Sequence, residues 1–210
     1  MMKTSRPIAE FLIQSKAIIL EPARPFQWAS GWKSPIYCDN RKTLSYPDIR
    51  TAIRDAYVET IQSNFDTPEI IAGVATGAIA QGALVADKMH LPFIYIRSSA
   101  KGHGMQNQIE GVYAAGQKVL VIEDLISTGG SSLKAVEALR EAGCEVIGMV
   151  ATFTYGFPAA QEAFKEADLK VHCLTDYEAL LELALEKKVL SKEQMPVLRN
   201  WRKDPANWSL

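Results

Sequence analysis

The feature that most constrains the fold is a series of short apolar segments separated by loops and helical patterns. These segments lie at residues 69–74, 91–96, 119–122, 145–153 and 170–174. The segment 119–122 has no polar alternation, as expected for a strand covered on both faces. Helical patterns separate the last three segments, at residues 131–142 and about 159–166. Strands that alternate with helices predict an α/β fold with a parallel sheet.

The beginning and the tail of the chain do not follow this alternation. A helix is predicted over residues 8–20, and a second one after Tyr46-Pro47-Asp48. Prolines and aromatic residues fill the segment between them, and helices are predicted at 177–188 and 192–201. Four tryptophans outside the alternation are interpreted as packing of an accessory lobe or as subunit contacts: Trp28, Trp32, Trp201 and Trp208.

We expect a single domain, because 210 residues are close to the size of one large domain. Its parts are expected to be N-terminal helices and a small accessory lobe at 1–65, the α/β core at 66–175 and C-terminal helices at 176–210. The net charge of −1 gives no electrostatic reason for nucleic-acid or acidic-membrane binding.

The three cysteines are far apart and form no C-x-x-C pair, so neither a disulfide framework nor a zinc site is expected. The N-terminal residues are not followed by the apolar stretch of a secretory signal. No window reaches the roughly 18 apolar residues of a membrane-spanning helix. A soluble, cytoplasmic protein is therefore expected.

The most informative segment for function runs from Val119 to Ser132. An apolar strand is predicted to end in Glu123 and Asp124, and a loop of small residues then leads directly into a helix. In open α/β sheets, ligands bind at the carboxyl ends of the strands. The loop contains Leu125, Ile126, Ser127, Thr128, Gly129, Gly130 and Ser131. Its glycines permit positive φ, its hydroxyls can donate, and the helix N-terminus attracts anions, so the segment predicts a monophosphate site.

The two carboxylates before this loop would repel a phosphate, so they must serve another part of the ligand. Hydroxyls of a sugar attached to that phosphate suit them, because carboxylates accept hydrogen bonds from a diol. The alternative is an ordinary helix-capping loop. The segment is neither a Walker loop, since no Lys follows the glycines, nor a G-x-G-x-x-G turn.

A second informative segment spans residues 95–111. A strand is predicted to end in Arg97, and a polar loop follows in which two glycines flank His103 close to Lys101. The alternative is a solvated surface loop. Cations on a glycine-hinged loop suit a diphosphate leaving group, because they can close over it and exclude water.

The segment 119–131 resembles the phosphoribosyl-diphosphate (PRPP) binding motif of the type I phosphoribosyltransferases, a motif that does not select the base. Residues 95–111 resemble the catalytic loop of the orotate phosphoribosyltransferase family, as do 33–41 and 152–158. The resemblance covers residues 8–203. It implies a type I phosphoribosyltransferase fold, in which helices flank the parallel sheet and the N-terminal segment forms a hood lobe.

The resemblance further implies transfer of the 5-phosphoribosyl group from PRPP to orotate, with Mg²⁺, in UMP biosynthesis. The products are orotidine 5′-monophosphate and diphosphate. Mg²⁺ is expected to bind mainly through PRPP and water, with no protein ligand assigned. A homodimer is implied in which each loop reaches the PRPP site of the neighbour.

Site residues follow from the same resemblance. Arg97, Lys101 and His103 match the part of the family motif that binds diphosphate, and Glu123 to Ser131 match the part that binds the rest of PRPP. Lys101, His103 and Asp124 are the expected catalytic residues. The positions matched to orotate are Ser127, Lys33 and Tyr37.

Two positions depart from the family pattern. Ser98 stands where many members have Lys, and Tyr155-Gly-Phe-Pro lacks an Arg with which some members hold the carboxylate of orotate. Main-chain N–H groups or Lys33 are therefore expected to hold it. The alternatives are a phosphoribosyltransferase for purine bases and a non-catalytic regulator that senses PRPP. The regulators carry an added DNA-binding domain and a basic surface, for which this chain has neither length nor charge.

Overall fold

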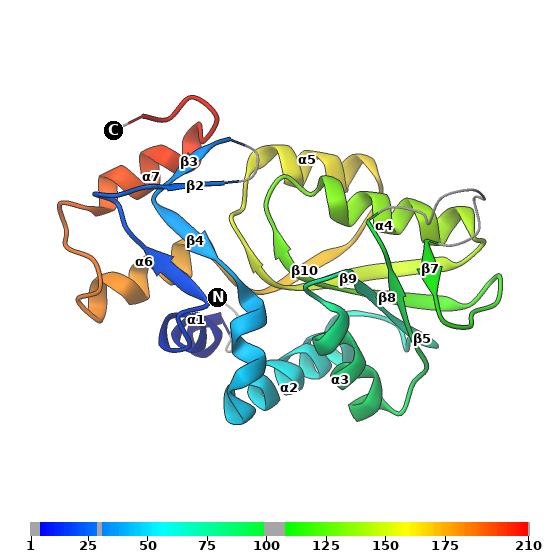
Figure 1. Cartoon of the computed structure of the whole chain (residues 1–210). Coiled ribbons are helices and arrows are strands. Elements are labelled where there is room, and N and C mark those ends of the chain that lie inside the picture. The colour runs from blue at the N-terminus through cyan, green and yellow to red at the C-terminus, as the bar shows by residue number, and fades with distance from the viewer. Residues whose placement is uncertain (1–4, 29–30, 99–107, 210) are drawn as a thin grey trace.

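The computed structural model describes residues 5–28, 31–98 and 108–209. Within these residues the main sheet has six strands in the order β10-β9-β8-β5-β6-β7 (Figure 1). Their bounds are Ile70–Val74 (β5), Phe93–Ile96 (β6), Ile109–Glu110 (β7), Lys118–Ile126 (β8), Glu145–Thr154 (β9) and Val171–Asp176 (β10). All neighbouring pairs are parallel except β6 and β7. The predicted α/β fold with a parallel sheet is confirmed.

Helices cover both faces of this sheet. The helices are α1 (Ser5–Gln14), α2 (Pro47–Asn64), α3 (Ile79–Met89), α4 (Gly130–Glu141), α5 (Pro158–Glu166), α6 (Tyr177–Glu186) and α7 (Met195–Lys203). One buried cluster joins the sheet to α4 and α5, and a second joins its other face to α1, α2, α3 and α6. Figure 1 shows α4 and α5 on one side of the sheet, with α2 and α3 on the other. Burial on both faces explains why the strand segments are so uniformly apolar.

Strand β8 shows how the alternation of side chains prepares the site. Val119 and Val121 pack on the α4 and α5 side, whereas Leu120 and Ile122 pack on the opposite side. Successive side chains of a strand point to opposite faces. The next two residues, Glu123 and Asp124, therefore project to opposite faces as well.

Two small antiparallel sheets form a lobe beside the main sheet, which we call the hood. β1 (Ile18–Leu20) pairs with β4 (Ile36–Cys38), and β2 (Phe26–Gln27) pairs with β3 (Lys33–Ser34). A 3₁₀ helix over Asn40–Ser45 then leads from the hood into α2.

Aromatic side chains attach the hood to α7. Trp201 is fully buried and packs edge-on against Trp28 and Tyr155. Its indole Nε1 donates to the Lys33 carbonyl at 3.0 Å, and Trp28 Nε1 donates to the Ile36 carbonyl at 3.2 Å. The interpretation of the tryptophans as lobe packing is confirmed for these two residues.

The prediction of one helix over 8–20 is wrong. The helix ends at Gln14, where the Ser15 hydroxyl bonds the Phe11 carbonyl at 2.7 Å and Lys16 adopts a φ of 54°. Residues 18–20 then form β1, because their β-branched isoleucines pair with β4.

The end of β8 likewise differs from the prediction that the strand ends at Glu123 and Asp124. The strand continues to Ile126, because β9 is long enough to pair with it there: Leu125 lies opposite Phe153 and Ile126 opposite Thr154. The two carboxylates consequently lie inside the strand. Among the described residues, no helix is long and apolar enough to cross a membrane.

Candidate functional site

The candidate site lies where the parallel strands end at their carboxyl side. β8 leads there into residues 127–131, which we call the phosphate loop. The loop contains an abrupt turn, since Gly129 has a φ of 81° and α4 starts at Gly130. Positive φ at Gly129 is as predicted, but Gly130 is already helical. A Cβ on Gly129 would lie 2.9 Å from Cζ of Phe164, so only glycine fits this turn.

The N-terminus of α4 is open to an anion. Within the described part of the chain no side chain caps this 12-residue helix, and its first turn has no acidic residue. Thr128, Gly130 and Ser131 are exposed at the same place, and Ser127 is half-buried. Unpaired N–H groups, the positive end of the helix dipole and exposed hydroxyls together form a site suited to a phosphate group.

Asp124 lies against the turn that follows β5. A Cβ on Gly77 would be 2.0 Å from Oδ2 of Asp124, so the carboxylate is packed directly onto the backbone of that turn. The peptide bond between Ala75 and Thr76 is cis. The turn at 75–77 and the carboxylate predicted to bind the sugar are thus adjacent.

Glu123 lies behind Asp124 and is only 3% exposed. Its Oε1 accepts from the Asp124 amide at 2.9 Å, and its Oε2 accepts from the Ser132 hydroxyl at 2.8 Å. Burial and the neighbouring Asp124 charge raise the pKa of Glu123 to about 8. Burial also raises the pKa of Asp124. We assign the shared proton to Glu123, the more buried residue, which leaves the negative charge on Asp124.

Strand β8 is held in place from the α2 side. The hydroxyl of Tyr57, which is fully buried, donates to the Glu123 carbonyl at 2.6 Å and shares a second hydrogen bond of 2.6 Å with Thr152. The amide of Asn40 donates to the Asp124 carbonyl at 2.6 Å. The backbone carbonyls of both Glu123 and Asp124 are therefore held by side chains from other elements.

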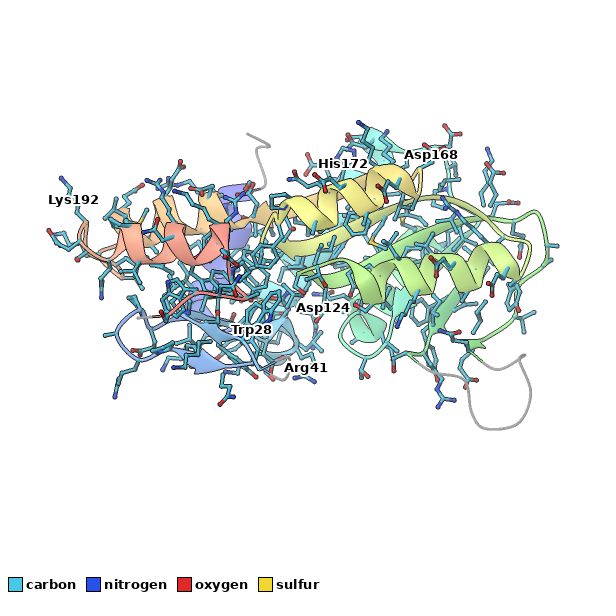
Figure 2. All side chains as sticks on the ribbon, turned by 90° about the horizontal axis from the view of Figure 1, so that it is seen from above. Trp28, Arg41, Asp124, Asp168, His172 and Lys192 are labelled. Atoms are coloured by element: carbon cyan, nitrogen blue, oxygen red, sulfur yellow. The ribbon has the colours of Figure 1, made fainter. Side chains whose placement is uncertain are left out.

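The residue after Asn40 brings a cation to the site. Arg41 bonds Asp39 Oδ1 through its Nε at 2.7 Å and through its backbone amide at 3.3 Å. Its side chain is 59% exposed. Figure 2 shows Arg41 and Asp124 close together, where the hood meets the main sheet. The sequence alone indicates no role for Arg41, although its segment, 33–41, carries part of the family resemblance.

A small cavity of about 180 Å³ lies between the ends of β5 and β6 and the start of α4. The backbone of Arg97 is fixed there by two hydrogen bonds with Gln108. The Arg97 amide donates to the Gln108 carbonyl at 2.8 Å, and the side-chain amide of Gln108 donates to the Arg97 carbonyl at 2.9 Å. The lining residues are Val74, Ala75, Ile96, Arg97, Ser98, Gln108, Ser131, Lys134 and Ala135. Two cations beside the phosphate loop suit a second anionic group.

Lys134 was missed by the sequence analysis. It lies three residues after Ser131, which places both side chains on one face of α4. That spacing is the signal that could have identified it.

The other predicted residues are less closely grouped. Lys33 is exposed on β3, and Tyr37 is 38% exposed on β4, with its ring 5.5 Å from that of Phe26. Leu125 and Ile126 are strand residues that pair with β9. Lys101 and His103 lie outside the described residues.

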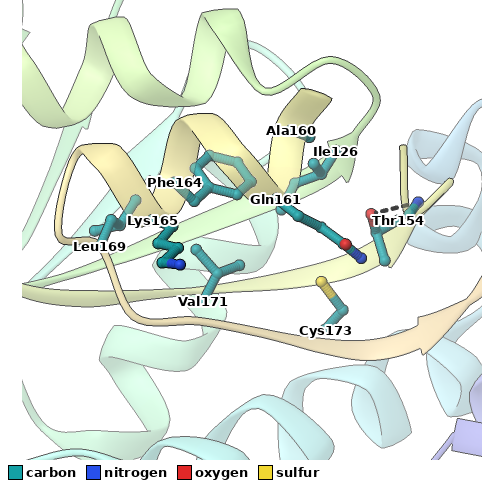
Figure 3. Close-up of a pocket in the computed structure, with 10 residues that line it drawn as sticks. Ile126, Thr154, Ala160, Gln161, Phe164, Lys165, Leu169, Val171 and Cys173 are labelled. Carbon is teal, nitrogen blue, oxygen red and sulfur yellow. Dashed lines mark hydrogen bonds between the residues drawn. The ribbon is translucent and has the colours of Figure 1, made fainter. Parts of the chain in front are cut away.

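A second cavity, of about 330 Å³, lies behind the phosphate loop, between α5 and strands β9 and β10 (Figure 3). Its lining is mostly apolar and includes Ile126, Phe164, Leu169, Val171 and Cys173, with Gln161 and Lys165 as polar members. Phe164 is also the side chain that supports Gly129. The phosphate loop thus packs against Phe164, an apolar side chain that also lines this cavity.

Among the described residues, no group of three or more His, Cys, Asp or Glu side chains could hold a metal ion. Asp124 and Glu123 are adjacent carboxylates, but both oxygens of Glu123 accept internal hydrogen bonds. The arrangement suits a cation that arrives with an anionic substrate and keeps several waters.

Comparisons with known proteins agree on one family. A model described as the phosphoribosyl transferase domain matches residues 43–180. The chain is 61% identical over 208 residues to the orotate phosphoribosyltransferase of Phocaeicola vulgatus, covering 99% of this chain and 98% of that one. It is 58% identical to that of Porphyromonas gingivalis over the full length of both chains. The crystal structure of the Aeropyrum pernix orotate phosphoribosyltransferase superposes with a TM-score of 0.74 at 27% identity, covering 87% of this chain and 98% of that one.

Proposed function

The chain belongs to the phosphoribosyltransferase family, and within it to the orotate phosphoribosyltransferases; on this premise we propose that it forms orotidine 5′-monophosphate and diphosphate from PRPP and orotate. One observation carries the proposal. The uncapped N-terminus of α4 directly follows the end of β8, where Asp124 lies, and Ser132 in the first turn of α4 bonds Glu123; a single substrate that carries both a phosphate and a sugar diol can use the helix N-terminus and the carboxylate together.

The geometry supports one placement of PRPP. Its 5′-phosphate binds residues 127–131, and its ribose hydroxyls bind Asp124, which Glu123 holds in place from behind. Its diphosphate points toward Arg97 and Lys134. Lys101 and His103, assigned by family resemblance, complete the diphosphate side.

Catalysis in this arrangement depends mainly on positioning and charge. The C1′–oxygen bond to diphosphate breaks as N1 of orotate forms its bond to C1′, and the N1 proton passes to the departing diphosphate or to water. Positive charge develops on the ribose in the transition state. The Asp124 carboxylate stabilises that charge, while the cations on the other side stabilise the departing diphosphate. No protein side chain is assigned as the general base, because the diphosphate product is itself basic enough to accept the N1 proton.

Mg²⁺ is the proposed cofactor, and it would neutralise charge on the diphosphate. PRPP and water would supply most of its oxygen ligands, and Asp124 is the carboxylate that would hold it on the protein side. We also propose a homodimer with shared sites, a place in UMP synthesis and a cytoplasmic location, which suits charged metabolites as substrates.

A turnover assay with different bases tests the function. The purified protein, with PRPP and Mg²⁺, is expected to consume orotate and to leave adenine, guanine and xanthine unchanged. Turnover of a purine base in place of orotate would establish the purine alternative. Binding of PRPP without turnover of any base would favour a regulator.

A further inference from the structure

We propose that Arg41 binds the carboxylate of orotate and selects against pyrimidine bases that lack this group. The inference rests on the proposed function, because it requires the base to lie beside a ribose held at Asp124. It assigns the carboxylate to a residue of the hood rather than to the loop after β9.

The position of the base follows from the position of the ribose. The base bonds C1′, which is next to the C2′ hydroxyl, so a ribose held at Asp124 places the base within a few ångströms of that carboxylate. The turn from the end of β4 into the 3₁₀ helix, at residues 38–41, is attached to the same place, since Asn40 donates to the Asp124 carbonyl at 2.6 Å. A base on C1′ therefore lies between the phosphate loop and this turn.

Arg41 is oriented to receive an anion there. Asp39 occupies the Nε edge of its guanidinium at 2.7 Å, and the backbone amide of Arg41 bonds the same oxygen. Within the described part of the chain, neither Nη atom of Arg41 has a hydrogen-bond partner, and the side chain is 59% exposed. A planar edge with two N–H donors matches a carboxylate in bidentate geometry.

The electrostatics agree with this placement. The pKa of Arg41 is raised mainly by its hydrogen bond to Asp39, with a smaller contribution from Asp124. The guanidinium is therefore within electrostatic range of Asp124, the carboxylate proposed to bind the ribose. It also compensates the repulsion that an anionic base would meet from Asp124.

The other cations near the hood are directed elsewhere. Lys42 donates to the Lys16 carbonyl at 3.2 Å, and Arg24 pairs with Glu21 at 3.7 Å. Arg202 bonds Glu178 at 2.8 Å and the Gly156 carbonyl at 3.2 Å. Lys33, the predicted candidate, is exposed on β3, and its neighbour Ser34 is fully buried. Since adjacent strand residues face opposite ways, Lys33 projects toward solvent.

The test compares two nucleotides that differ only in this carboxylate. Calorimetry measures the Kd of orotidine 5′-monophosphate and of UMP for the wild type and for Arg41→Gln. We expect the wild type to prefer orotidine 5′-monophosphate. In Arg41→Gln its Kd should rise about 10- to 100-fold, as for loss of a charge-assisted pair, while the Kd of UMP changes less than about twofold. Arg41→Lys should give an intermediate loss, because it keeps the charge but not the fork.

Two matched variants complete the experiment. Arg24→Gln removes another exposed arginine of the hood and should leave both Kd values unchanged, whereas Lys33→Gln tests the predicted alternative. An unchanged preference in Arg41→Gln, or an equal loss for both nucleotides, would overturn the proposal. Failure of the wild type to turn over orotate would instead refute the proposed function, so the two failures are distinguishable.

Discussion

At the scale of single residues, Glu123 and Asp124 are adjacent in the chain, yet their side chains contact different elements. Glu123 reaches Ser132 on α4, whereas Asp124 lies against Gly77 at the end of β5. The buried carboxyl keeps its proton and the partly exposed one carries the charge. One ionised carboxylate beside a phosphate site repels an anionic substrate less than two would.

Asp124→Asn is expected to fold normally and to lose most turnover. The amide keeps the shape of the side chain, but it removes the charge that stabilises the ribose in the transition state. We expect kcat/KM for PRPP to fall about 100-fold or more while Tm changes little. A wild-type kcat/KM would refute the role assigned to Asp124.

Glu123→Gln is expected to change how stability depends on pH. The folded protein keeps the Glu123 proton up to about pH 8, whereas an unfolded glutamate releases it near 4.5. The unfolded state therefore binds fewer protons between these values, and the free energy of unfolding falls as pH rises, by no more than about 5 kcal/mol from this group. The glutamine introduced by this substitution cannot titrate, so the variant should gain stability relative to the wild type across this window.

Urea unfolding of both proteins at about pH 5 and about pH 8 measures this difference. Ser132→Ala serves as the control, since it removes a partner of Glu123 but leaves the carboxyl titratable. A stability difference between wild type and Glu123→Gln that does not change with pH would contradict the raised pKa.

The sequence predicted the residues of the phosphate loop because they form one continuous segment with a recognisable order. It gave no role to Arg41 or Lys134, which reach the site from the hood and from the second turn of α4. Isolated cations are common on protein surfaces, so only their spatial position distinguishes these two. Ser132 ends the segment that predicts the phosphate site, but its bond to Glu123 depends on the face of β8 from which Glu123 projects.

At the scale of elements, the site depends on a close contact between the turn after β5 and the side chain of a β8 residue. The missing side chain at Gly77 leaves the space that Asp124 occupies. The sequence predicted both strands, but it could not predict this contact, because it depends on their register. Similarly, the isoleucines at 18 and 19 fit a helical pattern locally, and only pairing with β4 makes them a strand.

Gly77→Ala is expected to displace Asp124, because the added Cβ would lie 2.0 Å from its Oδ2. A shift of about 1 Å in a catalytic group can cost about 100-fold in rate, so kcat/KM for PRPP should fall at least about tenfold. Gly82→Ala is the matched control, since its Cβ would meet the Phe93 ring at 2.7 Å, away from Asp124. Equal effects of the two variants on activity and Tm would mean that Gly77 serves stability alone.

At the scale of the whole molecule, the proposed dimer predicts complementation between inactive variants. Lys101→Ala impairs the loop that serves the neighbour, and Asp124→Ala impairs the site in its own subunit. In a symmetric dimer with shared sites, a mixed dimer has one site with both lesions and one with none. Co-refolding the two variants should recover up to about half of the wild-type activity per mixed dimer. No recovery in verified mixed dimers would show that each loop serves its own subunit.

The contact between Trp201 and the hood also has a consequence for the order in which the protein is made. The indole of Trp201 bonds the Lys33 carbonyl across 168 positions of the chain and is fully buried against Trp28. A ribosome synthesises strands β5 to β8 and the phosphate loop well before it adds α7. The half of the site that binds PRPP can therefore take shape on a nascent chain, whereas the hood acquires its last supporting side chain only near the end of translation.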